Sequence, residues 1–322
     1  MRHAISRRVF FCAEGAVMQY TKRPLTHGRQ ANVLIYRGMH GDRQLMKKQL
    51  RAVGYYRLSG YWHPFRAKDA GGNLTNSFKP DTRFEVVWDR YVFDRKLRFI
   101  LLDAIERFEI FMRSQIAYWH SHAHGPFAYA EDRTSLPKPN DEMYAEYLEA
   151  VKRETEQSKR QTFVEHFRAK YGDCHEFLPI WMATEVMNFG TIKTLFDSSS
   201  NEVKQNIVSP LELPFKVVSS WLLAMNAGRN ICAHHSRLWN KELGVKPSVP
   251  LRRDYPDWHA PETPNTGRVY ALLTFCRYSL KRIAPQSRWH ERLQRLIAAH
   301  PEIPLNEMGF PANWEQSPIW AE

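Results

Sequence analysis

The stretch that decides the fold is residues 84–122, FEVVWDRYVFDRKLRFILLDAIERFEIFMRSQIAYWHSH. Its apolar residues recur every three or four positions, which places them along one face of an α-helix. These residues are Tyr91, Leu97, Ile100, Leu101, Ala104, Ile105, Phe108, Phe111, Met112 and Ile116. Gly125 and Pro126 follow this pattern, and both residue types favour a helix end. The segment therefore predicts one long amphipathic helix.

The same periodicity predicts further helices on both sides of this segment. We expect them at residues 42–53, 141–171, 179–189, 215–235, 267–283 and 287–300. Gly54, Gly172 and Gly190 stand where the first three would end, and Asp141 stands where the second would be capped. No segment shows sustained period-two alternation, and no repeat of 20–50 residues recurs. The fold class is therefore predicted to be all-α.

The segments between these helices differ in composition. Residues 71–76 are predicted to form a polar loop, and about 244–266 a proline-rich loop. The densely charged part of residues 141–171 indicates a solvated helical excursion, at about 130–175, from a domain spanning 21–322. Residues 1–20 are expected to be an N-terminal extension, with either Met1 or Met18 as the true start.

Composition limits the classes of function. The chain has 322 residues, with 46 Lys+Arg against 34 Asp+Glu and a formal charge of +12, so its surface should attract polyanions such as nucleic acid. A basic balance is also common in proteins that bind no nucleic acid. No apolar run approaches the roughly 18 residues of a membrane span, which argues against a membrane protein. The four cysteines form no C-x-x-C pair, so we expect a cytoplasmic protein without a zinc motif.

The candidate catalytic segment is Arg229-Asn230-Ile231-Cys232-Ala233-His234-His235. An arginine and a histidine with four to six residues between them are typical of one class of helical ribonucleases, but this chain is rich in both residue types. The spacing recurs at Arg57/His63, Arg113/His120, Arg160/His166, Arg168/His175, Arg252/His259 and Arg295/His300. The segment differs from these because it ends an apolar helical stretch. Its polar groups either line a solvated cleft or are cations that favour the helix dipole.

A second candidate is the aromatic segment of residues 55–66. Arg57, Tyr61, Trp62 and Arg66 could form a platform that stacks RNA bases and binds phosphates. The alternative is an aromatic packing corner, which we favour because buried aromatic residues are the commoner case.

Three segments together resemble the Abi-like family, bacterial abortive-infection proteins of the AbiD/AbiF type. They are Tyr55-Tyr56-Arg57-Leu58-Ser59-Gly60-Tyr61-Trp62, then Ala104-Ile105-Glu106-Arg107 with Glu109 and Arg113, and then Arg229 through His235 continued by Ser236-Arg237-Leu238-Trp239-Asn240. The resemblance runs from about residue 24 to about residue 320. It implies a HEPN-like helical bundle with additional helices, and RNA as the partner, either as substrate or as an antitoxin or guide RNA.

The resemblance also implies roles for individual residues. Arg229 and His234 would be the catalytic pair, with Asn230 as the accompanying polar residue and His235 as the alternative histidine. A possible second polar site comprises Glu109, Arg113 and His120, with a structural pair of Glu109 and Arg113 as the alternative. Apart from the resemblance, the candidate RNA-binding residues are Arg57, Tyr61, Trp62, Arg66 and Arg237. No cofactor and no metal are expected. The activity implied is a metal-independent endoribonuclease that acts in phage defence.

Helix geometry adds a condition to this interpretation. Five residues turn an ideal helix by about 500°, so Arg229 and His234 would lie some 140° apart, whereas Asn230 and His234 share a face. Either the helix ends or distorts near Ala233, or two copies form a composite site, for which we expect a homodimer. Two rivals remain: an RNA-binding module without catalysis and a protein-interaction component of a defence system. A metal nuclease is disfavoured, because no acidic residues cluster with His234 in the sequence.

Overall fold

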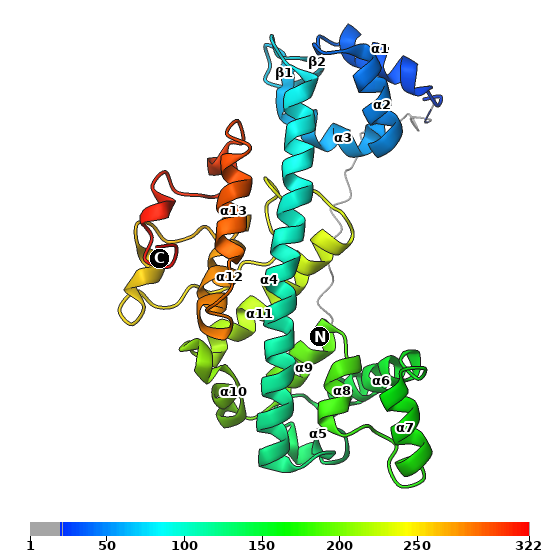
Figure 1. Ribbon diagram of the computed structural model, residues 1–322, viewed down its shortest axis with the longest axis vertical. Coiled ribbons are helices and arrows are strands. Elements are labelled where there is room, and N and C mark those ends of the chain that lie inside the picture. Colours follow the sequence, from blue (N-terminus) through cyan, green and yellow to red (C-terminus); the bar gives the residue numbers. More distant parts are fainter. Residues whose placement is uncertain (1–19, 21, 322) are drawn as a thin grey trace, which may run out of the picture. The chain divides into compact units, whose positions relative to one another are not determined.

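The computed structural model describes residues 20 and 22–321, and within them thirteen α-helices and one two-stranded sheet (Figure 1). The predicted all-α class is confirmed, since the sheet contributes only two short strands. The predicted N-terminal extension, residues 1–20, lies outside the described residues except for Tyr20. The chain forms two compact units, one ending at Glu85 and the other beginning at Val86.

The first unit contains three helices and the small sheet. Its elements are α1 (His27–Tyr36), α2 (Arg43–Val53), α3 (Tyr55–Trp62), β1 (Arg66–Lys68) and β2 (Leu74–Phe78). The Asp42 side chain caps α2 by accepting a hydrogen bond from the Leu45 amide at 2.6 Å. Gly54 ends α2 with φ of 91°, a conformation that favours glycine, so the predicted bounds of this helix are confirmed.

The aromatic segment belongs to the core of this unit. Tyr61 and Trp62 are 2% and 4% exposed. The Trp62 ring lies 4.9 Å from the ring of Tyr55 and 6.5 Å from that of Phe78, both edge-on. These contacts fit the packing-corner interpretation of Tyr61 and Trp62.

The β1–β2 hairpin was not predicted. The sequence predicts a loop at residues 71–76. Residues 71–73 do lie in the turn of the hairpin, but residues 74–76 belong to β2. The Asp69 side chain holds this turn by accepting from the amides of Gly71 and Asn73 at 3.0 and 2.9 Å. Burial along β2 does not alternate, because only its last residue is fully buried, so the strand carries no period-two signal.

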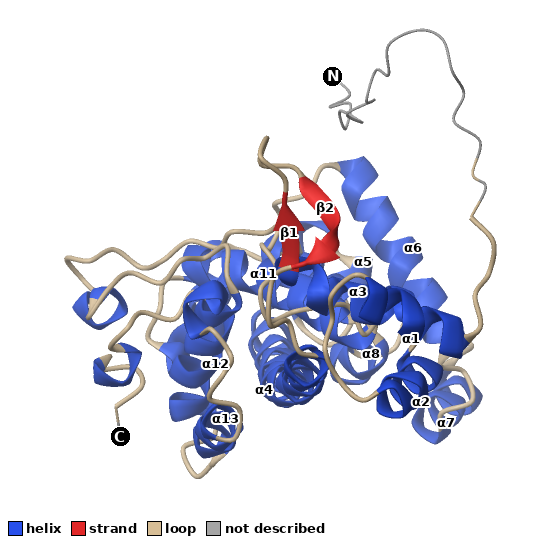
Figure 2. Ribbon diagram, turned by 90° about the horizontal axis from the view of Figure 1, so that it is seen from above, coloured by secondary structure: helices blue, strands red, loops and turns tan. Residues whose placement is uncertain are grey.

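The second unit is organised around α4 (Phe84–His124), the long helix predicted from residues 84–122. Three helices pack along it: α11 (Phe215–Ala233), α12 (Val269–Ile283) and α13 (Trp289–Ala298). Figure 2 views α4 nearly end-on, with α12 and α13 on one side of it. The indole nitrogen of Trp289 donates to the Ile100 carbonyl at 2.7 Å, which ties α13 to α4. The rings of Phe108 and Phe275, 5.3 Å apart, join α4 to α12.

Gly228 sets the close approach of α11 to its neighbours. A β-carbon at this position would lie 3.1 Å from Leu272 Cδ1 on α12 and 3.8 Å from Ile105 Cδ1 on α4. The backbone of α11 therefore contacts both helices where a larger side chain would separate them.

The remaining helices correct three sequence predictions. They are α5 (Ala128–Glu131), α6 (Asp141–Gln157), α7 (Thr162–Tyr171), α8 (Ile180–Val186), α9 (Phe189–Ser198) and α10 (Asn201–Val208). The single helix expected at 141–171 is two helices, because the wholly polar residues 158–161 form a turn with nothing apolar to bury. Asn140, not Asp141, caps α6. Gly190 lies inside α9, which Asn188 caps through the Thr191 amide, and so ends no helix.

The charged excursion is anchored to the rest of the unit by a buried carboxylate. Glu154 of α6, 5% exposed, accepts from the Asn188 amide and from the Thr191 hydroxyl, both at 2.9 Å. Val151 and Thr155 are also buried. One face of α6 therefore packs against the start of α9, although its densely charged part was predicted to be solvated.

The proline-rich loop is held against α11 and α12. The Trp221 indole donates to the Ser248 carbonyl at 2.9 Å, and Trp258, 1% exposed, lies 5.9 Å from the Trp221 ring.

Within the described part of the chain, no single helix is long and apolar enough to cross a membrane. The pair Asn201–Leu211 and Phe215–Ala233 meets that criterion only jointly, across a bend of 75°.

The contact at Gly228 yields a stability prediction. Gly228→Val places branched carbons against Leu272 and Ile105, so we expect the free energy of unfolding to fall by about 1–3 kcal/mol. Urea denaturation followed by circular dichroism measures this change. Ala227→Val, at the half-buried preceding position of the same helix, is the control and should cost less. Equal losses for the two variants would contradict the close approach as the constraint on residue 228.

Candidate functional site

The candidate catalytic segment lies at the end of α11. Arg229 and Asn230 are exposed on the last turns of the helix, which ends at Ala233, and His234 is the residue that caps it. His234 and His235 are both exposed. Of the two arrangements predicted from helix geometry, a helix end near Ala233 is therefore present.

The chain reverses direction after α11 through a C-terminal capping motif. The His235 amide donates to the Cys232 carbonyl at 3.0 Å, and the Ser236 amide donates to the Ile231 carbonyl at 2.9 Å. His235 has φ of 56°, the left-handed conformation that glycine usually supplies at this position. A left-handed residue with a β-carbon costs about 1–2 kcal/mol, so other contacts must hold this turn.

A buried carboxylate from α4 supplies such contacts. Asp94 is fully buried, and its Oδ1 accepts from the amides of Leu238 and Trp239 at 3.1 and 2.7 Å. Its Oδ2 forms an ion pair with Arg98, one helical turn later and 5% exposed. Arg98 in turn donates to the Ser236 carbonyl at 3.2 Å. Asp94 and Arg98 together bind the backbone that follows the two histidines.

The cysteine within the segment points away from the exposed groups. Cys232 is buried, and this burial raises the pKa of its thiol to about 12, with the Arg98 charge opposing the shift and the Asp94 charge adding to it. The thiol therefore stays protonated at neutral pH and offers no nucleophile to a substrate.

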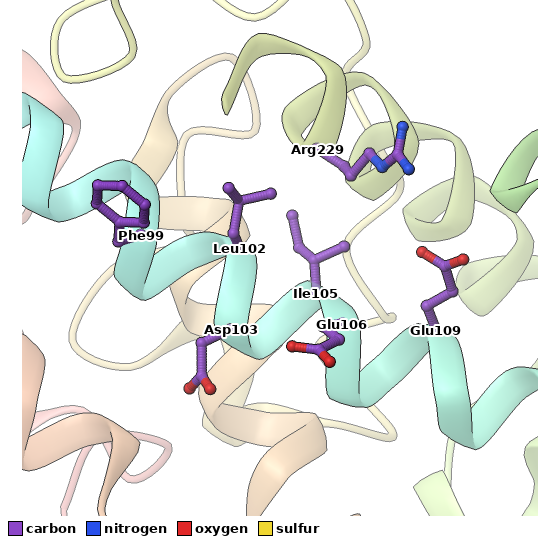
Figure 3. A pocket seen from close by; sticks show the side chains of 7 residues that line it. All are labelled: Phe99, Leu102, Asp103, Ile105, Glu106, Glu109 and Arg229. Atoms are coloured by element: carbon purple, nitrogen blue, oxygen red, sulfur yellow. The ribbon is translucent and has the colours of Figure 1, made fainter. Parts of the chain in front are cut away.

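Arg229 opens onto a pocket along α4. The pocket is lined by Phe99, Leu102, Asp103, Ile105, Glu106, Glu109 and Arg229, and Figure 3 shows their side chains. Arg229 Nη1 donates to the Asn230 side-chain oxygen at 3.3 Å. Within the described structure Arg229 forms no ion pair, so most of its guanidinium donors face the pocket and solvent.

The histidines do not share this pocket. Asn230 and His234 are four residues apart on one exposed face of α11, whereas the Arg229 side chain turns toward α4. The structure therefore brings Arg229 together with Asn230 but leaves His234 at the helix end, with no hydrogen bond between Arg229 and His234. A phosphate bound by Arg229 contacts an imidazole only if the RNA extends around the end of α11 or if a second copy supplies the histidine.

The second predicted polar site divides in two. Glu109 and Arg113 form an ion pair, and Arg113 also donates to the Thr184 carbonyl of α8. His120 is fully buried, and neither of its ring nitrogens has a hydrogen-bond partner. Burial, with a smaller contribution from the nearby His124, lowers its pKa to about 4, so this imidazole is neutral at pH 7. Glu109 instead joins the pocket of Arg229.

The residues predicted to bind RNA are distributed over the chain. Arg57 is exposed on α3, whereas the Arg66 Nε donates to the Thr75 carbonyl of the hairpin at 2.6 Å. Tyr61 and Trp62 lie in the core of the first unit, as described above. Arg237 is half-buried, two residues after His235.

Sequence reasoning missed the importance of Asp94 and Arg98. A signal exists, because the two lie four residues apart beside Phe93 and Leu97 on the buried side of the long helix. Opposite charges at this spacing within an apolar stripe indicate a buried ion pair and not a surface one.

Comparisons with known proteins add one finding. A model of a family described as Abi-like protein matches residues 48–240, which include Glu109, Arg113 and the whole segment from Arg229 to His235. No curated protein and no solved structure gives a match. Among the residues that the structure describes, no three or more His, Cys, Asp or Glu side chains are grouped so that they could hold a metal ion.

The Asp94 contacts predict a large effect of one substitution. Asp94→Asn removes the charge that balances the buried Arg98, so we expect the free energy of unfolding to fall by about 3–5 kcal/mol. Asp103→Asn, which breaks partly exposed pairs with Arg107 and Arg292, should cost about 1 kcal/mol or less. Urea denaturation of both variants measures the difference. A similar loss in both would refute the assignment of Asp94 as the anchor of the segment.

Proposed function

Because the chain belongs to the Abi-like family, we propose that it is a phage-defence endoribonuclease of the abortive-infection type. The observation that carries this proposal is the exposure of Arg229, Asn230 and His234 at the end of an otherwise buried helix. Cations placed only to favour the helix dipole need no anchored turn after them. Here a buried ion pair from another helix binds that turn, and Arg229 keeps its donors open toward a pocket.

The proposed reaction is cleavage of RNA by its own ribose 2′-hydroxyl. Arg229 would bind the nonbridging phosphate oxygens through its forked donors and stabilise the charge that develops on them. His234 would transfer a proton, since an imidazole exchanges protons near neutral pH, and Asn230 would orient Arg229 through the contact at 3.3 Å. The products would be a 2′,3′-cyclic phosphate and a 5′-hydroxyl. This chemistry requires no metal.

The separation of Arg229 from His234 determines how the site is completed. We propose a homodimer in which His234 of one copy approaches the phosphate held by Arg229 of the other, as in a HEPN-type composite site. The formal charge of +12 would bring RNA to either arrangement. His235 is the alternative imidazole, on the same exposed turn.

The same separation supports a second candidate function. In one copy, Arg229 and Asn230 can bind a phosphate without any imidazole beside it. An RNA-binding protein without catalysis, which holds an antitoxin or guide RNA, would need no more than this. Cleavage assays distinguish the two functions because both require RNA binding.

Variants of the segment test the proposed reaction. We expect Arg229→Ala and His234→Ala each to lower the cleavage rate by at least about 10²-fold in the presence of EDTA. His234→Ala should retain RNA affinity, because the imidazole contributes to proton transfer and not to phosphate binding. Purified protein is incubated with total cellular RNA, and the ends are mapped. Metal dependence, or 3′-hydroxyl ends, would contradict the mechanism.

His235→Gly distinguishes the two histidines, because glycine suits the left-handed backbone at this position. We expect this variant to cleave at the wild-type rate. Loss of cleavage would show that His235 is the reacting imidazole.

A mixing experiment tests the composite site. Arg229→Ala and His234→Ala are each inactive as homodimers, but a mixed dimer contains one site with both groups intact. After subunit exchange at equal concentrations we expect about a quarter of wild-type activity, since half the dimers are mixed and half their sites are intact. No recovery, or full activity of a strict monomer by light scattering, would place both groups in one chain.

A further inference from the structure

The proposed reaction leaves one chemical requirement unmet. Cleavage needs a group that accepts the 2′-hydroxyl proton, a group that stabilises the phosphorane and a group that protonates the leaving 5′-oxygen. One arginine and one imidazole supply only two of these. We propose, on the premise of that function, that Glu109 is the catalytic residue that accepts the 2′-hydroxyl proton.

Three carboxylates line the pocket of Arg229, and their surroundings differ. Asp103 is bound by Arg292 at 2.5 Å and by Arg107 at 3.4 Å, on the side of α4 that faces α13. Glu106 is exposed, and in Figure 3 its carboxylate points toward Asp103 and away from Arg229. The Glu109 carboxylate rises from α4 on the side of Arg229. Glu109 is thus the acid placed beside a phosphate held by Arg229.

The surroundings of Glu109 hold it in this position. Its Oε1 accepts from Arg113, which is itself fixed by the Thr184 carbonyl of α8. The Glu109 side chain is 15% exposed, and its Oε2 has no protein partner, so that oxygen is open to the pocket. A base held on one oxygen and open on the other can receive a proton without moving.

The charged groups that face Glu109 come from α4 and α11. Arg113 on its own helix and Arg229 on α11 are the cations that face it, and Glu106 and Asp103 are the nearby acids, the second already paired. α8 contributes the Thr184 carbonyl, which carries no charge. Glu109 therefore lies beside two guanidinium groups, which offset the negative charge of an RNA phosphate brought to it.

The proposed step exchanges one bond between phosphorus and oxygen for another and involves two proton transfers. The 2′-oxygen loses its proton to Glu109 Oε2 and attacks phosphorus, and the bond between phosphorus and the 5′-oxygen breaks. The imidazolium of His234, from the same copy or from a second one, gives a proton to that oxygen. The cyclic phosphate and the 5′-hydroxyl are released, after which Glu109 loses its proton and His234 regains one through water.

Glu109→Gln tests this assignment with Glu106→Gln as the matched control. Glutamine keeps an oxygen for Arg113 but cannot accept the proton, so we expect kcat/KM in EDTA to fall by about 10²–10⁴-fold. Glu106→Gln removes a charge from the same pocket, three residues earlier, and should leave the rate within about threefold. RNA affinity measured by fluorescence anisotropy should change little in either variant. Equal activity of the two variants would overturn the assignment of Glu109 while leaving the nuclease proposal intact.

The pH–rate profile of the wild-type protein gives a second test that requires no variant. A carboxylate base loses activity only below about pH 4–5, whereas a second imidazole in that role loses activity below about pH 6.5. We expect the first behaviour, and Glu109→Gln should abolish that acid limb. An acid limb near pH 6.5 would assign the role to His235 and overturn the assignment of Glu109. Wild-type protein that binds RNA but leaves it uncut would overturn the nuclease and with it the role of Glu109.

Discussion

The structure around the candidate site depends on one buried carboxylate, Asp94. Removing an ionised group from water costs several kcal/mol, and this cost is recovered only when every part of the group finds a partner. Asp94 finds them in the Arg98 guanidinium and in two backbone amides of the segment after α11. The two amides lie more than a hundred residues away in the chain, so these hydrogen bonds form only when α4 and the end of α11 are in register. The same contact that stabilises the fold therefore determines where the exposed histidines lie.

Two residues at the end of α11 and just after it are locally unfavourable. Gly228 brings the helix against α4 and α12, and His235 adopts a left-handed conformation that its side chain disfavours. Both are unfavourable choices in isolation, because glycine weakens a helix and a β-carbon strains the turn. Packing against α4 and α12 requires the glycine, whereas the bonds from Asp94 and Arg98 to the backbone after His235 hold the strained turn. The anchor does not involve the side chains of Arg229, Asn230 and His234, which remain exposed.

The sequence predicted elements whose signals are local. The bounds of α2, α4 and α11 follow from apolar spacing with a glycine, a proline or a change to polar residues at each end. The break between α6 and α7 and the hairpin were missed, because polar residues can continue a helix and because burial along β2 does not alternate. Arg229 and His234 were identified by position, but the pocket joins Arg229 to Glu109 across 120 residues of chain. Such a contact depends on tertiary packing and has no counterpart in local spacing.

The phase of α11 connects these observations with the proposed chemistry. Five residues turn a regular helix by about 500°, so an arginine and a histidine at this spacing diverge. The helix continues through Ala233, the residue before His234, which leaves Arg229 on the α4 side and His234 at the tip. Under the proposed mechanism, one copy thus holds the phosphate-binding group and the base in one pocket, and the acid outside it. A nuclease built in this way is incomplete until the acid reaches the bound phosphate. Under the same proposal, association of two copies would control the cleavage activity without any change in the fold of either.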